Sequence, residues 1–178
     1  MQHVDEWVYY WQRPELFVWW DDHVSPEMIV FLGYEGVIHR DGQRHSFEHM
    51  LNVERLLDFF PRLKLVLLPD WPLDYLGDDF RAPFAPHLRR RVIGAIPAMP
   101  AQSGGVVPLF PAYEAARRFL APWKWPWHGL VLDASLSGWP RQQESEYRTI
   151  RRLWVKPAEG FDGQALNLAT SMIQRIVD

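Results

Sequence analysis

Short runs of mainly apolar residues recur along the chain, and each one ends at a glycine, proline or aspartate. Four of them stand out, at 28–32, 63–68, 91–96 and 129–133. Continuous apolar runs of this length are typical of strands buried on both faces of a sheet. A weaker fifth strand is expected over 149–155. The pattern therefore predicts five short strands, most of them central in a sheet.

Between these runs, apolar residues recur with helical spacing. Residues 47–60 place their apolar side chains largely on one side, with Ser46 positioned as the N-cap and Pro61 at the end. A second helix is expected to begin at Pro111, since proline suits the first helical turn, and a third to cover about 162–177. Strands alternating with helices predict an α/β fold. We expect a Rossmann-like, three-layer domain with a mainly parallel five-stranded sheet.

The first 27 residues do not share this alternation. Residues Trp7 to Trp11 and Leu16 to Trp20 are rich in aromatics and are separated by a short polar link, which predicts an aromatic β-hairpin. The chain is thus divided into a hairpin extension, 1–27, and an α/β domain, 28–178. The hairpin is either an accessory on the sheet or a surface for a protein partner or a second copy, because Trp and Tyr dominate binding hot spots.

Composition narrows the classes of protein that remain. The 178 residues include 19 basic and 22 acidic residues and no cysteine, which excludes disulfides, thiol chemistry and a Cys-ligated zinc site. The acidic balance argues against a broad nucleic-acid surface. The short basic runs 89–91 and 151–152 are interpreted as solvated surface, some of it stacking on nearby aromatic rings. No run is apolar enough to span a membrane and no leader is evident, so we expect a cytoplasmic protein.

Three carboxylates follow strands of the expected sheet: Glu35, Asp70 and Asp133. In an open parallel sheet, ligands bind outside the carboxyl ends of the strands. Converging carboxylates there could hold Mg²⁺, which takes one or two protein carboxylates and completes its shell with water and phosphate oxygens. The alternative is that these acidic residues only cap the turns that follow the strands.

Several of these segments, in the same order, resemble haloacid dehalogenase-like (HAD-like) phosphohydrolases. The first is the run Ile29-Val30-Phe31-Leu32-Gly33-Tyr34-Glu35-Gly36-Val37-Ile38-His39, which is followed by Asp41-Gly42 and is similar to the family's strand ending in Asp-x-Asp-Gly. Further matches lie at 65–71, 84–94, 130–133 and 153–161. The resemblance is closest to the small cap-less branch found in bacterial RNA-repair proteins, and it implies the same α/β fold.

The residues that carry catalysis in that family are largely replaced. In the family, the first Asp attacks phosphorus and the second is the general acid and base; here these places hold Gly33 and Glu35. Glycine has no side chain with which to form a phospho-enzyme. The phosphate-binding Ser/Thr falls within 68–70, where an aspartate would repel phosphate. The acidic pair that holds Mg²⁺ is reduced to Asp133, with Ala134 beside it.

Aromatic residues supply further candidate binding positions. Gly33, Tyr34 and Trp71 stand at strand ends beside the carboxylates, and Trp123, Trp125 and Trp127 are interleaved with proline and one lysine. Alternating aromatics can stack on single-stranded nucleic acid, although one lysine provides little affinity for phosphate. A local aromatic cluster is the alternative interpretation.

One further pattern resembles a metal site. Residues His45 to His49 match His-x-x-Glu-His, in which two histidines share a zinc ion. The pentad crosses the expected start of a helix, so histidines flanking a helix cap are the alternative interpretation.

These observations predict a catalytically degenerate HAD-like protein, a pseudo-phosphatase that acts as a binding or regulatory module through its aromatic surfaces and needs no cofactor. The alternative is a Mg²⁺-dependent phosphohydrolase in which Glu35 and Asp133 hold the metal and activate water. A third hypothesis is a module that binds nucleic-acid ends.

Overall fold

The computed structural model describes residues 28–40, 42, 46–72, 80–96, 109–120, 128–136, 138–141 and 150–178. The expected hairpin within 1–27, His45, and Trp123, Trp125 and Trp127 lie outside these ranges. No helix in the described ranges combines the length and the apolar character needed to cross a membrane.

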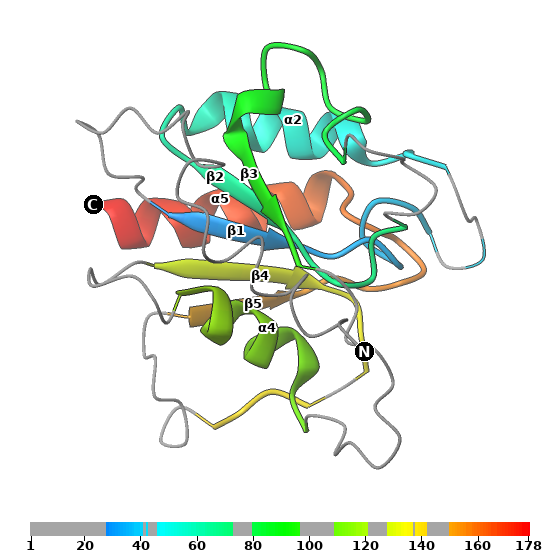
Figure 1. The fold of residues 1–178 in the computed structure, drawn as a ribbon, viewed down its shortest axis with the longest axis vertical. Coiled ribbons are helices and arrows are strands. Elements are labelled where there is room, and N and C mark those ends of the chain that lie inside the picture. Colours follow the sequence, from blue (N-terminus) through cyan, green and yellow to red (C-terminus); the bar gives the residue numbers. More distant parts are fainter. Residues whose placement is uncertain are drawn as a thin grey trace, which may run out of the picture.

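A five-stranded sheet forms the centre of the described structure (Figure 1). Its strands are β1 (Ile29–Leu32), β2 (Lys64–Leu67), β3 (Val92–Ala95), β4 (Gly129–Asp133) and β5 (Ile150–Trp154). They are arranged in the order β3-β2-β1-β4-β5, and every pair is parallel. The expected α/β class and five-stranded parallel sheet are therefore confirmed. β4 has the expected bounds, and the other four strands are one or two residues shorter than expected.

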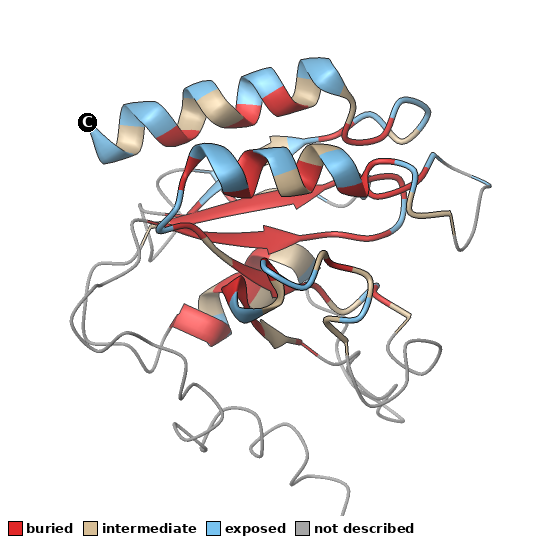
Figure 2. Cartoon of the chain, turned by 90° about the horizontal axis from the view of Figure 1, so that it is seen from above, coloured by how far each residue is buried: buried red, intermediate tan, exposed pale blue. Residues whose placement is uncertain are grey.

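Helices cover both faces of this sheet (Figure 2). The helices α2 (Met50–Phe59) and α5 (Gly163–Val177) pack together on one face, and α4 (Pro111–Leu120) covers the other. A short 3₁₀ turn, η2 (Arg89–Arg91), leads into β3. The three layers follow from the sequence because parallel strands need long crossover connections, and these connections lie on the sheet faces.

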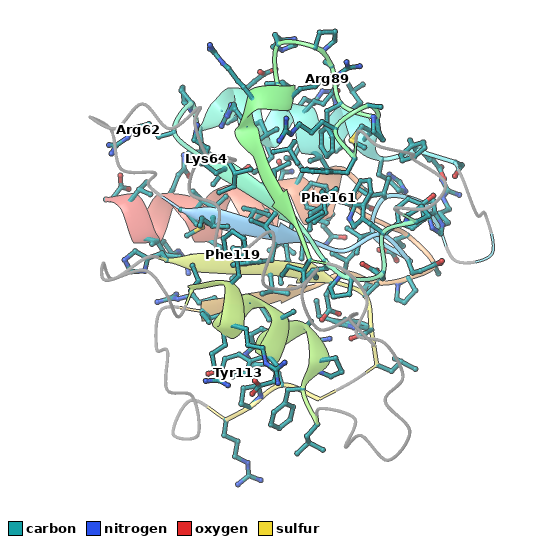
Figure 3. The ribbon with its side chains drawn as sticks, in the orientation of Figure 1. Arg62, Lys64, Arg89, Tyr113, Phe119 and Phe161 are labelled. Carbon is teal, nitrogen blue, oxygen red and sulfur yellow. The ribbon has the colours of Figure 1, made fainter. Side chains whose placement is uncertain are left out.

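The core consists of two apolar clusters separated by the sheet. β1 is buried at every position because it pairs with β2 on one side and β4 on the other. Its side chains alternate between the clusters: Phe31 meets Phe119 of α4 at a ring-centroid distance of 5.7 Å, whereas Val30 shares the opposite cluster with Phe161 (Figure 3). Burial on both faces explains why β1 is uniformly apolar.

The expected start of α2 is wrong by three residues. Ser46 does not cap this helix: its hydroxyl oxygen is buried without a hydrogen-bond partner, and His49 occupies the N-cap position without a side-chain capping bond. The His49 N–H instead donates to the Ile38 carbonyl oxygen at 2.8 Å. A tertiary contact with the loop after β1 thus decides where the helix begins. At α5, by contrast, the Asp162 carboxylate caps the helix, accepting from the Ala165 N–H.

One charged side chain is buried at the amino-terminal edge of the sheet. Arg91 is 8% exposed, and its guanidinium donates to the carbonyl oxygens of Leu57, Phe60 and Leu63. Its two bonds to Leu63 measure 2.9 and 2.8 Å. The interpretation of 89–91 as solvated surface is therefore wrong for Arg91, which joins the end of α2 to the strands β2 and β3.

Candidate functional site

The strand order contains one topological switch point. From β1 the chain moves through α2 to β2 and then to β3 at one edge, and it returns through α4 to β4 on the other side of β1. In open α/β sheets, the crevice between the two oppositely directed connections lies at the carboxyl ends of the strands and is the usual ligand site. Here it lies beyond β1 and β4, where the chain places Gly33 and Asp133.

A pocket of about 570 Å³ opens at this position. Its described walls come from the ends of β1, β2 and β4, from the first turn of α4, and from Pro157 after β5. All three carboxylates singled out in the sequence, Glu35, Asp70 and Asp133, line it. The three carboxylates lie around one pocket because parallel strands present their carboxyl ends at a common edge of the sheet.

Asp133 is the most deeply buried of the three carboxylates, at 4% exposure. Its Oδ1 accepts the Ser135 N–H at 2.6 Å and an Arg152 Nη2–H at 2.9 Å. Its Oδ2 is buried and has no hydrogen-bond partner. An orphaned carboxylate oxygen is unusual in a protein interior, where polar atoms are normally satisfied.

Arg152 is a site residue that the sequence did not identify. It pairs with Val131 across β4 and β5, and Asp133 lies two residues beyond Val131, so both side chains project from the same face of the sheet. The Arg152 side chain is 14% exposed, and its guanidinium also lies over the Trp139 ring at 5.6 Å. The interpretation of 151–152 as solvated surface is therefore wrong for Arg152, although the expected stacking of a basic side chain on a nearby aromatic ring is found here. Only the strand register brings Arg152 to Asp133.

Asp70 ties the end of β2 to the loop after β1. Its Oδ2 accepts the backbone N–H groups of Tyr34 at 2.8 Å and Glu35 at 3.0 Å. Desolvation by the surrounding protein raises the pKa of Asp70 to about 6. The backbone N–H donors lower this pKa, and the charge on Asp133 raises it further. The residue retains exposed surface, so solvent moderates the effect. Asp70 thus caps a turn and lines the pocket.

Glu35 stands at the rim of the pocket, with its side chain 52% exposed. Its Oε2 lies 3.5 Å from Nε2 of His39, a fully buried side chain whose Nδ1 lies 2.8 Å from the Arg40 carbonyl oxygen. Across the described ranges, no three His, Asp or Glu side chains come together closely enough to hold a metal ion.

Gly33 occupies a position with no room for a side chain. Its N–H donates to the Leu132 carbonyl oxygen at 2.8 Å. This bond holds the backbone after β1 close to the end of β4. A Cβ atom on this residue would lie 2.9 Å from that same oxygen and 3.3 Å from Val37 Cγ2. Any other residue would therefore require the backbone to move.

Tyr34 and Trp71, the aromatic binding candidates at the strand ends, lie in the core. They are 2% and 3% exposed, their ring centroids are 5.1 Å apart, and Trp71 stacks on Phe84. The Trp71 indole N–H donates to the Leu32 carbonyl oxygen at 2.8 Å. Neither residue is among the described side chains that line the pocket.

The described part of the His-x-x-Glu-His pattern is engaged in other contacts. Glu48 pairs with Arg40 at 3.0 Å, and its second oxygen lies 4.0 Å from Nε2 of His49. His49 is 7% exposed, and burial lowers its pKa. These residues form part of the packing between the loop after β1 and α2.

Comparison with protein-family models, with curated proteins and with solved structures finds no match to this chain. The function is therefore inferred from the chemistry of the pocket.

Proposed function

We propose that this chain is a catalytically degenerate HAD-like protein whose strand-end pocket binds a ligand without transferring phosphate, so that it acts as a binding or regulatory module. The observation that carries this proposal is the environment of Gly33. The residue in the place of the nucleophilic aspartate has no side chain, and the Leu132 carbonyl oxygen fills the space that a Cβ would need.

The charges of the pocket support the same proposal. Phosphoryl transfer depends on positioning the phosphoryl group and neutralising its negative charge. Among the described residues that line the pocket there are three carboxylates and no Lys, Arg or His. The nearby cation, Arg152, is already bound to Asp133 at 2.9 Å. A phosphate group in this pocket would be repelled by the carboxylates.

The Mg²⁺-dependent alternative asks Glu35 and Asp133 to share a metal ion. Asp133 directs Oδ1 to Arg152 and to a backbone N–H, and Glu35 lies beside His39. Both carboxylates would have to exchange these partners for the metal. The proposal of a binding module needs no such rearrangement. The nucleic-acid hypothesis concerns the segment 121–127, which lies outside the described residues.

The test is a phosphatase assay on the purified chain with an aryl phosphate and Mg²⁺. We expect no turnover above the rate without protein, and no gain in Gly33→Asp, because the new side chain meets the Leu132 carbonyl oxygen. Asp58→Asn, an exposed change on α2, is the control for loss of one negative charge. Turnover that persists in Asp58→Asn but disappears in Glu35→Gln or Asp133→Asn would overturn the proposal and favour the Mg²⁺-dependent enzyme.

A further inference from the structure

The pocket combines an apolar wall with an acidic lining. Leu68, Pro69, Pro111, Leu136 and Pro157 provide apolar surface. Leu136 is 91% exposed, which extends that surface to the rim. Small-molecule sites are typically apolar clefts of several hundred Å³ in which a few polar groups fix the orientation of the ligand. This pocket has the size and the apolar surface of such a site, and its charged groups are carboxylates.

The charged side chains in the described lining of the pocket all carry the same sign. The described lining has no basic side chain. The N-terminus of α4 contributes a partial positive charge, but Pro111 has no N–H to donate, and Glu114 lies in the first turn. Among the described residues that line the pocket, the charged side chains are therefore all carboxylates.

Asp133 independently indicates that a hydrogen-bond donor is missing from the pocket. Only 4% of this residue is exposed. It forms part of the pocket wall, and its Oδ2 accepts no hydrogen bond. Arg152 and the Ser135 N–H both use the other oxygen, Oδ1. Leaving a buried charged acceptor unsatisfied is costly, so an N–H donor from a ligand would be worth more here than at an exposed carboxylate.

We propose that this pocket binds a small organic cation, a protonated alkylamine whose ammonium group is held by Asp133 and Asp70 and whose hydrocarbon body lies against Leu68, Pro111 and Leu136. This inference rests on the proposed function and names the ligand class of that site. An ammonium group has three donors, which suits carboxylates on two different strands. An alkyl chain gains further affinity from the apolar wall.

The test is isothermal titration calorimetry of the full chain with probes of matched length and different charge. n-Hexylamine, 1-hexanol, hexanoate and hexyl phosphate share one hydrocarbon body. We expect hexylamine to bind at least about tenfold more tightly than each of the others, the scale of one charge-assisted hydrogen bond. Nα-acetyl-lysine methylamide carries the same ammonium group on a peptide unit. Tighter binding of this compound than of hexylamine would indicate a lysine side chain of a partner protein, and tighter binding of hexylamine would indicate a free amine.

Variants locate the binding on the carboxylates. Asp133→Asn and Asp70→Asn are each expected to weaken hexylamine binding about tenfold, whereas Asp58→Asn, at the other edge of the sheet, leaves it unchanged. Asp70→Asn keeps an oxygen for the Tyr34 and Glu35 N–H groups, so it provides a folded variant if Asp133→Asn does not fold.

Two results would overturn the inference: hexanoate or hexyl phosphate binding as tightly as hexylamine, or no difference between Asp58→Asn and both pocket variants. Either result can occur in a chain that shows no phosphatase activity, so the ligand class can fail while the proposed function stands. Turnover of aryl phosphate is the separate failure of the proposed function.

Discussion

Two charged side chains are buried at opposite edges of the same sheet, and they differ in how completely they are satisfied. Arg91 precedes β3 at the amino-terminal edge, and Asp133 ends β4 at the carboxyl-terminal edge (Figure 1). They are 8% and 4% exposed. Because burying a charge is costly unless it is paired, each edge must offer partners for its charge.

The amino-terminal edge satisfies its charge from the protein alone. Arg91 donates to the carbonyl oxygens of Leu57 and Phe60 at the end of α2, and of Leu63 just before β2. The carbonyl oxygens of Leu57 and Phe60 also accept backbone N–H groups, so Arg91 provides a second donor to each. The carboxyl-terminal edge provides donors for only one oxygen of Asp133. Burial alone therefore does not distinguish these two charges; they differ because one oxygen of Asp133, beside the pocket, has no hydrogen-bond partner.

The largest effect is expected from removing the satisfied charge. Arg91→Met removes the guanidinium donor from three buried carbonyl groups, of which those of Leu57 and Phe60 keep a backbone N–H donor. We expect the free energy of unfolding to fall by about 3 kcal/mol or more. Urea denaturation measures it. Arg90→Met, at the exposed neighbouring position, is the matched control and should change stability by no more than about 0.5 kcal/mol. Equal stability of the two variants would contradict a structural role for Arg91.

The fold and the placement of the carboxylates could be predicted because both depend on local patterns. Four apolar runs and the weaker fifth segment became five strands, and Glu35, Asp70 and Asp133, which follow or end three of these strands, line one pocket. The expected helix over about 162–177 also agrees with α5, whose start depends on a local contact between the Asp162 carboxylate and the Ala165 N–H three residues later.

The partners of the buried charges could not be predicted because they depend on tertiary structure. Arg91 and Arg152 belong to short basic runs, which are usually solvated, and nothing adjacent in the sequence distinguishes them. Arg152 meets Asp133 only through the register of β4 and β5, and Arg91 meets three carbonyls between 28 and 34 residues away. Ser46 failed as a cap for the same reason: a backbone bond from His49 to Ile38 sets the start of α2.

An intermediate loss of stability is expected when either partner of the Arg152–Asp133 pair is replaced, and the two replacements should differ in size. Arg152→Met leaves the buried Asp133 carboxylate with only the Ser135 N–H, and we expect a loss of about 2 kcal/mol. Asp133→Asn keeps an oxygen to accept from Ser135 and removes the buried negative charge, so its loss should be only about 1 kcal/mol. Thermal and urea unfolding measure both. If Asp133→Asn costs more than Arg152→Met, the carboxylate is satisfied in the free protein and the two edges are equivalent.

The smallest effect is expected in the pH dependence of stability at Asp70. Its pKa lies at about 6 in the folded chain and at 3.8 in the unfolded chain, so between about pH 4 and pH 6 the folded state binds more protons. Stability from this group is therefore highest below about pH 4, falls as the pH rises to about 6, and is constant above that. Asp70→Asn keeps the acceptor for the Tyr34 and Glu35 N–H groups and lacks this decline.

The stability of Asp70→Asn relative to the native chain should consequently increase from about pH 4 to about pH 6 and then remain level, as measured by urea unfolding at a series of pH values. The comparison of the two proteins is needed because His49, whose pKa is lowered by burial, acts in the opposite direction: its unfolded form takes up a proton first as the pH falls, which lowers stability. That contribution is common to both proteins and cancels in the difference. A difference that does not change with pH would mean that Asp70 is charged throughout in the folded chain, and that water reaches this side of the pocket more freely than its surroundings imply.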